Sequence, residues 1–457
     1  MSTPVAGSSL LPASPDYWSS EYGRGKSRGS VRRRRYRRRV HLMRQPRLAL
    51  LFSGGALNAI GSWATLIALW GFAAYRFHTG PAGIAILGLA WNVPGALLGP
   101  VAGIPIDRFG PKAVMIASDL LGLVTALCMA AAGSFGVLAG LAVAAGVVQS
   151  FGRPASMSLI PRIVDESELL AGNAFMGVAE QSAIVFGPLA GSLAINAWGI
   201  QAAFVFDAAT FAVGALSVLP LKLRECSRGT GRMPSKRELL AGLALARSIP
   251  DVRRTLWLAF AVFCSWGAFM VIEPLYVRDV LHRSPATLGW LQTVFGVGLI
   301  TTTALLPRIG DRVASVKVLA AAVAFSGVAA AVYVGTRSLL VAMAGVFVWG
   351  VDVAFFMPPM QTVLQRATPL EAHGRVMSLA ATANGVGSLV AIPIAGLAVG
   401  AIGVSRTGAL VGLLALLTGL AAAVTASGGA RTGKDPGALS RPASLPLTPV
   451  FGAVETE

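Results

Sequence analysis

Charged side chains are scarce in this sequence. Lys, Arg, Asp and Glu make up 13% of the 457 residues, and 54% are hydrophobic. Soluble domains usually carry roughly twice that charged fraction. Between Ala113 and Phe151 the single charged side chain is Asp119. The shortage of charge excludes an ordinary soluble domain and predicts a membrane protein.

The residues and motifs of common catalytic sites are also lacking. The three cysteines, Cys128, Cys226 and Cys264, are scattered, with neither a disulfide framework nor a metal-binding spacing. The four histidines do not cluster, and there is no Walker A sequence, no H-E-x-x-H and no nucleophile elbow. We therefore expect no enzymatic activity, no ATP-driven pumping by this chain alone, and no metal or cofactor.

Long apolar blocks predict an all-α integral membrane fold. Backbone groups in lipid must bond internally, so each block of about 20 residues is expected to be a helix. About twelve transmembrane helices are predicted, near 48–72, 82–105, 113–133, 135–156, 171–195, 201–220, 256–280, 286–307, 315–334, 338–363, 375–399 and 407–426.

The two halves of the chain repeat. Asp107-Arg108 recurs 204 residues later as Asp311-Arg312. Pro154, Pro188 and Gly191 recur 205 residues later, in the same order, as Pro359, Pro393 and Gly396. A shared offset at equivalent helices predicts two pseudo-symmetric six-helix halves, 48–220 and 256–426. Such repeats suit a transporter whose binding site lies between the halves.

Basic residues predict the orientation. With both termini inside, the outer loops hold 5 of the 38 Lys and Arg, which leaves 33 on the cytoplasmic side. We expect a multi-pass protein of the cell inner membrane. Residues 1–47 and 427–457 are predicted to be disordered cytoplasmic tails, and 221–255 a basic cytoplasmic linker. The run VRRRRYRRRV at 31–40 either binds anionic lipid headgroups or only fixes topology; no nucleic acid is expected as a partner.

The loop after the second predicted span now indicates a family. Gly103, Asp107, Arg108, Gly110 and Lys112 form a pattern that resembles the signature of the major facilitator superfamily. A degenerate second copy contains Asp311 and Arg312. The resemblance implies the major facilitator fold and a cytoplasmic gate made by these residues. Gly95, Gly99 and Gly103 are four residues apart, so they are expected to line one helix face and admit a neighbouring helix.

The fifth span resembles an antiporter motif of the same family. It contains Gly187, Pro188 and Gly191, although Ser192 stands where the motif ends in glycine. Residues 154–173 resemble the drug-exporter branch that includes enterobactin and macrolide exporters. The acid that this branch often carries in helix 1 is absent, and Arg153 is expected at the cytoplasmic end of helix 4.

Ionisable side chains inside spans are costly and are candidates for function. Four stand out: Asp119, Glu180, Asp207 and Asp352. We predict that Glu180 and Asp352, nearest the middle of their spans, carry the coupled proton. Asp119 and Asp207 are either proton carriers or structural hydrogen-bonding groups. Glu273 lies close to the outer end of its span and is expected to contact water.

Uncharged polar residues supply candidates for the substrate cavity: Asn58, Trp63, Gln149, Gln292 and Asn384. With few fixed charges, such a cavity suits small amphipathic compounds. The leading interpretation is a monomeric, proton-coupled antiporter that exports a drug, natural product or siderophore by alternating access. A proton symporter or facilitator that imports a solute is an alternative, and a receptor or lipid-moving protein is another.

Overall fold

The computed structural model describes residues 46–164, 169–221, 243–369 and 372–428. Twelve helices in these ranges are long and apolar enough to cross a membrane, and no strand occurs among them. The predicted all-α membrane fold is therefore confirmed. Residues 1–45, most of the predicted linker, and 429–457 lie outside the described ranges, as does the basic run at 31–40.

The N-terminal half contains six spanning helices. They are α2 (Pro46–Gly71), which continues as a π-helical turn η2 (Phe72–Arg76); α3 (Pro81–Leu98), which continues through η3 (Gly99–Val101) to the short α4 (Gly103–Phe109); α5 (Pro111–Ala130); α6 (Phe135–Ile163); α7 (Leu169–Trp198); and α8 (Ile200–Val218).

The C-terminal half repeats this order. Its spanning helices are α10 (Pro250–Leu275), which continues as the π-helical turn η5 (Tyr276–Val280); α11 (Ala286–Ile309), followed by η6 (Gly310–Val313); α12 (Val316–Gly335); α13 (Leu339–Ala367); α14 (His373–Ile402); and α15 (Val404–Gly428).

Backbone geometry repeats together with the sequence. The turns η2 and η5 begin 204 residues apart, at Phe72 and Tyr276. His78 and His282, also 204 residues apart, are the only non-glycine residues with positive φ in the described backbone. Gly199 and Gly403 precede α8 and α15 with φ of 90° and 83°, which suits a residue without a Cβ. The repeat therefore extends to individual turn conformations.

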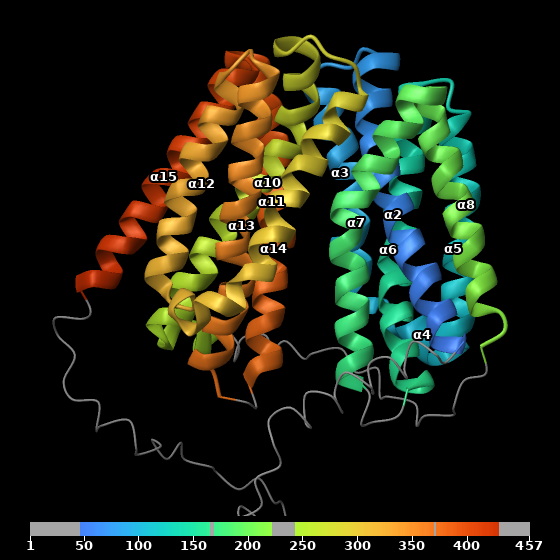
Figure 1. Ribbon diagram of the computed structural model, residues 1–457, viewed down its shortest axis with the longest axis horizontal. Coiled ribbons are helices and arrows are strands. Elements are labelled where there is room, and N and C mark those ends of the chain that lie inside the picture. Colours follow the sequence, from blue (N-terminus) through green and yellow to red (C-terminus); the bar gives the residue numbers. More distant parts are fainter. Residues whose placement is uncertain (1–45, 165–168, 222–242, 370–371, 429–457) are drawn as a thin grey trace, which may run out of the picture.

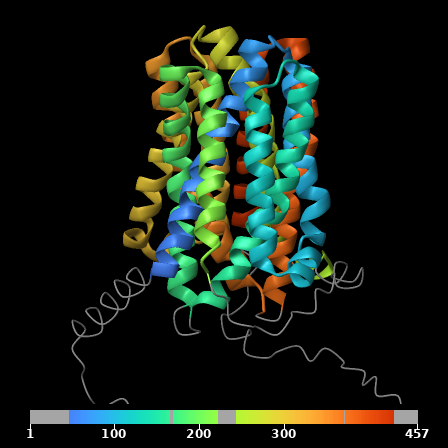
Figure 2. The same cartoon turned by 90° about the vertical axis from the view of Figure 1, so that its right-hand side faces the viewer.

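The helices run side by side between two ends of the molecule (Figures 1 and 2). We call the end where α2 begins and α15 ends the terminal side, and the opposite end the far side. The described basic residues of the far-side loops and helix ends include the five predicted there: Arg76, Arg278, Arg283, Arg337 and Arg406.

The hydrophobic core joins the two halves on the far side only. One buried cluster there contains residues of both halves, such as Phe72, Ile84, Tyr276 and Leu291. Toward the terminal side, the buried clusters of the C-terminal half and of the N-terminal half are separate. The two halves thus pack together on the far side and part toward the terminal side (Figure 1).

Glycines bring helices of one half into close contact. A methyl group at Gly350 of α13 would collide with the backbone oxygen of Phe295 of α11, and one at Gly298 would collide with that of Phe347. Such contacts give lipid-embedded helices their van der Waals packing.

We expect Gly350→Ala to lower the apparent melting temperature by about 3 °C or more, because overpacking a close contact costs roughly 1–3 kcal/mol. Gly400→Ala on α14 is the matched control, since no atom lies within 4 Å of the added methyl group. Thermal unfolding of the purified protein in detergent measures both. Equal melting temperatures for the two variants would contradict this account of the contact.

Candidate functional site

Arg278 closes the far side. Its Nη1 donates to the backbone oxygens of Ala74, at 2.9 Å, and Thr79, at 2.8 Å, both in the other half. Its Nε and Nη2 donate to the carboxylate of Asp279 at 2.6 and 3.0 Å. Carbonyls near a helix C-terminus carry partial negative charge, so a cation is favoured there. We call the contacts of Arg278 with Ala74 and Thr79 the far-side latch.

Two further hydrogen bonds join the halves nearby. The hydroxyl of Tyr75 donates to the backbone oxygen of Arg283 at 2.6 Å. The hydroxyl of Ser192 donates to the backbone oxygen of Ala286 at 3.0 Å, and Ser192 is fully buried. Ser192 replaces the final glycine of the family's motif, and this bond gives its hydroxyl a partner.

Helices α7 and α11 meet along what we call the α7–α11 seam. Gly289 of α11 lies against Pro188 and Ser192, and Gly296 lies against Ile184 and Val185. A side chain at either glycine would collide with the backbone of α7. The two glycines lie seven residues apart on the same face of α11, so the seam depends on both of them.

The antiporter-like residues of α7 also contact α2. A methyl group at Gly187 would collide with Trp63, and one at Gly191 would touch Ala64. Pro188 lies inside α7 between them. These three residues thus hold α7 between α2 of its own half and α11 of the other half.

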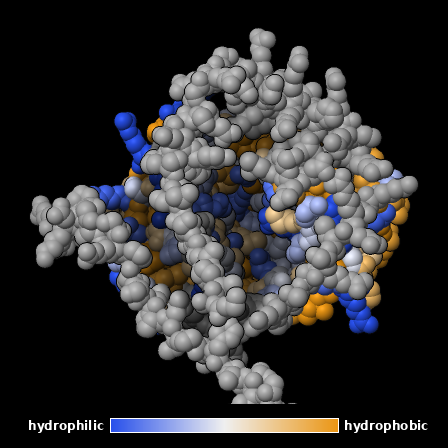
Figure 3. Space-filling view, turned by 90° about the horizontal axis from the view of Figure 1, so that it is seen from below, coloured by the Kyte–Doolittle hydropathy of each residue, from blue (hydrophilic) through white to orange (hydrophobic). Residues whose placement is uncertain are grey.

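The terminal side is hollowed between the halves. Seen from that side, hydrophilic side chains gather in the hollow between the halves (Figure 3). In the part of the chain that the structure describes, the inter-half hydrogen bonds lie on the far side or near mid-span, where Asn92 of α3 donates to the sulfur of Met270 at 3.7 Å. The hollow is the candidate functional site.

The predicted gate residues lie on the terminal side and, among the described residues, are not bonded to the other half. Asp107 is half-buried and has no hydrogen-bond partner in the described part of the chain, and the guanidinium of Arg108 lies 5.3 Å from the ring of Phe109. Lys112 donates to the backbone oxygens of Leu219 and Leu221 at 2.6 and 2.9 Å, which caps α8 of its own half. Arg312 is exposed, and the side chain of Asp311 lies outside the described residues.

The expectation of one glycine face in α3 is wrong for this conformation. The helix ends at Leu98, and a 3₁₀ turn containing Pro100 separates Gly99 from Gly103 of α4. No atom lies within 4 Å of a methyl group placed at Gly95, Gly99 or Gly103. Gly110 does need to be glycine here, because its φ is +84°.

Glu180 of α7 pairs with Arg153 of α6. Arg153 Nη2 donates to Glu180 Oε2 at 3.0 Å, and the two side chains are 69% and 37% exposed. Each residue lies about 15 Å from the terminal end of its helix at 1.5 Å per residue. Charged groups exposed at this depth are expected to face a water-filled space rather than lipid. We expected Arg153 at the end of its helix, and this is wrong, because α6 extends ten residues further to Ile163.

Asp119 and Asp207 are buried inside the N-terminal half. Asn58 Nδ2 donates to Asp119 Oδ1 at 2.8 Å, while Asp119 Oδ2 has no hydrogen-bond partner. Asp207 accepts from the hydroxyl of Thr210 at 3.1 Å and lines a cavity of about 10 Å³, which is room for roughly one water. Thr65 lines the same cavity.

Asp352 is buried between α13 and α12 of the C-terminal half. It lies against Ser326, whose hydroxyl accepts from Trp349 Nε1 at 2.8 Å. The carboxyl is thus enclosed by its own half and not exposed in the hollow.

Glu273 is buried as well, so the expectation that it contacts water is wrong. Its residue is 5% exposed. Gln292 of α11 donates to one carboxylate oxygen, and the hydroxyl of Tyr333 of α12 donates to the other at 2.7 Å. Side chains from α11 and α12 cover Glu273, and hydropathy along a single helix does not indicate such contacts.

The substrate-cavity candidates divide into three groups. Gln149 of α6 and Asn384 of α14 are exposed within their spans, as a cavity residue should be. Asn58 and Gln292 bond to buried carboxylates. Trp63 packs on Gly187 and is half-buried. The sequence placed Arg278 in an outer loop and Arg153 at a helix end without assigning either a role, and it did not indicate Tyr333; the charge of the two arginines was the available indication for them.

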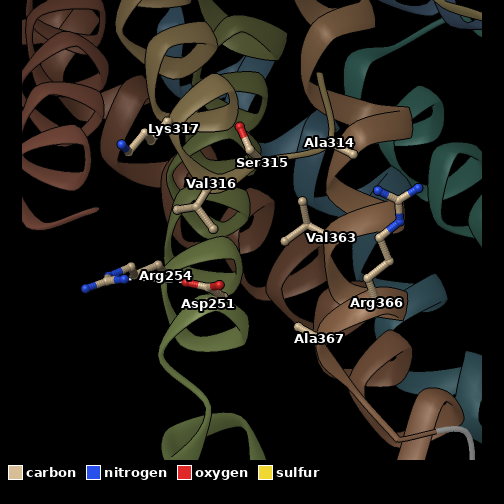
Figure 4. Close-up of a pocket in the computed structure, with 9 residues that line it drawn as sticks. All are labelled: Asp251, Arg254, Ala314, Ser315, Val316, Lys317, Val363, Arg366 and Ala367. Atoms are coloured by element: carbon tan, nitrogen blue, oxygen red, sulfur yellow. Dashed lines mark hydrogen bonds and ion pairs between the residues drawn. The ribbon is translucent and has the colours of Figure 1, made fainter. Parts of the chain in front are cut away.

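A second hollow lies outside the central one, near the terminal ends of α10, α12 and α13. It has a volume of about 430 Å³ and is lined by nine residues, among them Asp251, Arg254, Lys317 and Arg366 (Figure 4). Arg254 pairs with Asp251 at 3.4 Å and donates to the backbone oxygen of Thr425 at 3.0 Å. The hydrogen bond of Arg254 to Thr425 joins α10 to α15 within one half, while the pair with Asp251 lies within α10.

Twelve spanning helices in two halves around a central hollow define a polytopic membrane transporter. A family model described as Major Facilitator Superfamily matches residues 51–270 and 255–454. The chain belongs to the Major Facilitator Superfamily, whose members are transporters and not enzymes.

Several known proteins are similar over most of this chain. The uncharacterized MFS-type transporter YfiS of Bacillus subtilis is 22% identical, covering 82% of this chain and 92% of its own. Macrolide efflux protein A of Enterococcus faecalis is 21% identical, covering 66% and 96%. A bacterial homolog of the human lysosomal transporter Spinster, solved in an inward-facing and unoccupied conformation, shares the fold with a TM-score of 0.62 at 15% identity, covering 84% and 96%.

Proposed function

We propose that this protein is a proton-coupled antiporter that exports small amphipathic compounds by alternating access. One observation carries the proposal: the two halves are joined on the far side and parted on the terminal side around a hollow lined with hydrophilic side chains. A hollow open to one side at a time is what a secondary transporter needs.

The orientation in this proposal places the terminal side in the cytoplasm of the inner membrane. Few of the 38 Lys and Arg lie on the far side, and short cytoplasmic loops are enriched in these residues. The basic tail at 31–40 would then face the anionic inner leaflet. The conformation described here is, on this assignment, open to the cytoplasm.

Proton coupling is assigned to Glu180 first. Its carboxylate is held by Arg153 and is partly exposed, and in this proposal it faces the hollow, where water brings protons from the terminal side. When the terminal side closes, the pair loses water, and an ionised pair is then costly to keep. A proton that neutralises Glu180 lowers this cost. Asp352 is the second proposed carrier, in the other half, where no ion pair within the described residues involves it.

The gate proposed for the other conformation is made by Asp107, Arg108 and Gly103, with Arg312 opposite. None of these residues is bonded across the hollow within the described part of the chain, and Gly95, Gly99 and Gly103 have open space beside them. Close approach of the other half would use that space. The gate residues would contact their partners in the other half only when the terminal side closes.

The compound class follows from the lining and from the relatives. Within the described residues, the exposed polar groups inside spans that this proposal assigns to the hollow are one ion pair and neutral side chains such as Gln149 and Asn384. This suits an amphipathic solute better than a sugar phosphate. One relative is named a macrolide efflux protein, which makes macrolides the first compounds to test.

Transport into inverted membrane vesicles tests the proposal. A radiolabelled macrolide is the first probe, followed by lipophilic antibiotics that a growth-inhibition panel selects. Acidifying the vesicle lumen is expected to raise uptake at least fivefold, and a protonophore should abolish the increase. Vesicles without the protein are the control.

Each alternative function predicts a different result in these assays. Proton-driven accumulation in right-side-out vesicles would instead indicate import. No proton-linked flux for any selected compound would favour a receptor or lipid-moving protein.

A further inference from the structure

Three buried side chains form a polar cluster near the far side of the C-terminal half. Both carboxylate oxygens of Glu273 accept hydrogen bonds, Oε2 from Gln292 and Oε1 from Tyr333. The three residues come from α10, α11 and α12, and we call them the Glu273 cluster. None of the ion pairs in the described part of the chain involves Glu273. The carboxylate is thus held by neutral donors alone.

Neutral partners leave this glutamate free to gain and lose a proton. Adding a proton to Oε2 turns that oxygen into a donor and removes the negative charge. The side-chain amide of Gln292 can then turn and accept with its own oxygen, while Tyr333 goes on donating to Oε1. Glu180 differs, because a proton there displaces a guanidinium.

Few other titratable groups face Glu273. The helices packed against α10 bring Tyr333 of α12, and the turn η5 that follows α10 brings Tyr276. Asp352 of α13 contacts Ser326, which also accepts a hydrogen bond from Trp349. The ring centroid of Trp349 is 6.3 Å from that of Tyr333. The basic residues of the surrounding helices lie near helix ends: Arg308, Lys317, Arg366, His373, Arg375 and Arg406. Arg278 and Asp279 pair with each other.

Gln292 connects the cluster to the boundary between the halves. It lies on α11 three residues after Gly289 and four before Gly296, the two glycines of the α7–α11 seam. Residues at these spacings are neighbours on a helix surface. A change in the hydrogen bond of Gln292 therefore occurs beside the contact that must part when the far side opens.

Tyr333 connects the cluster to the far-side latch. Its ring packs edge-on against Tyr276, with centroids 5.4 Å apart, and the hydroxyl of Tyr276 donates to the backbone oxygen of Thr336 at 2.7 Å. Tyr276 begins the π-helical turn η5, and Arg278 of the latch follows two residues later.

We propose that Glu273 is a proton-binding site that controls opening of the far side. Gain or loss of this proton changes the hydrogen bonds that Gln292 and Tyr333 make beside the α7–α11 seam and the far-side latch, so the two protonation states stabilise the far-side-open and far-side-closed conformations unequally. This inference rests on the proposed proton coupling and assigns it a residue and a route. It also predicts that the balance between the two conformations depends on pH, because the conformation that binds the proton more tightly gains population as pH falls.

Pulsed EPR on the full-length chain in liposomes tests the inference without a transported compound. Nitroxides at Gly133→Cys and Arg337→Cys, which lie in exposed far-side loops of the two halves, report far-side opening in a background that lacks Cys128, Cys226 and Cys264. Lowering pH from 8.5 to 5.5 is expected to change the ratio of far-side-open to far-side-closed molecules at least fivefold. Glu273→Gln should remove this response.

Two milder variants keep the test informative if Glu273→Gln folds poorly. Tyr333→Phe removes a donor to Glu273 and should shift the midpoint of the response to higher pH, since the ionised form loses a hydrogen bond. Tyr276→Phe removes only the bond to Thr336 and should leave the midpoint unchanged.

The outcomes separate this inference from the proposed function. A full pH response in Glu273→Gln, or its loss in Asp352→Asn instead, overturns the inference while proton-driven flux in vesicles still supports antiport. A response to Na⁺ at constant pH overturns the assignment of the ligand as a proton. No pH response in the unaltered chain, together with no proton-linked flux, overturns both.

Discussion

An Arg278→Ala variant is expected to populate the far-side-closed conformation at least tenfold less, relative to the open one, than the unaltered protein. The guanidinium supplies two hydrogen bonds across the halves, to the backbone oxygens of Ala74 and Thr79. Hydrogen bonds to a charged group contribute roughly 1.5–3 kcal/mol each, and 1.4 kcal/mol is a factor of ten. The side chain is 21% exposed, so water replaces only part of what is lost.

The nitroxide pair at positions 133 and 337 measures this effect as a longer far-side distance. Arg283→Ala is the matched control, because that side chain is exposed and only its backbone oxygen bonds to Tyr75. Arg278→Lys should lie between the two, since an ammonium keeps the charge but lacks the planar fork of donors. If Arg278→Ala and Arg283→Ala gave the same distance distribution, the far-side latch would have no role in holding this conformation.

Glu180→Gln is expected to reduce proton-driven uptake into inverted vesicles at least tenfold. The variant keeps the size of the side chain and removes the carboxylate that pairs with Arg153. It also leaves Arg153 without its ionic partner, and an unpaired cation is costly once the terminal side closes and expels water. Loss of both the proton site and its counter-charge should therefore stop the coupled cycle.

Asp251→Asn gives a closely matched comparison for this variant. Asp251 also pairs with an arginine, Arg254, but its side chain is 58% exposed outside the central hollow. We expect this variant to keep at least half of the uptake, as exposed ion pairs contribute little. Equal uptake by the two variants would remove Glu180 from the coupling mechanism, and Glu180→Asp should recover part of the activity.

The sequence alone determined the twelve spans, the repeat of the two halves and the family. Hydropathy is a property of each segment, and lipid leaves the backbone no choice but to form helices, so these features need no knowledge of neighbouring helices. Span ends were less accurate where helices extend past the bilayer core, as α6 does, and this misplaced Arg153. The glycine pattern of α3 was read as one helix face because the 3₁₀ turn at Pro100 was not recognised.

Only the tertiary structure decided which side chains meet. Glu180 pairs with a residue 27 positions away, Glu273 with residues 19 and 60 away, and Arg278 with residues 199 and 204 away. Those partners depend on how each helix is rotated and which neighbour covers it, and hydropathy does not encode either. The sequence thus specified which segments enter the membrane, whereas packing between helices paired Glu180 with Arg153, buried Glu273 and closed the far side with Arg278.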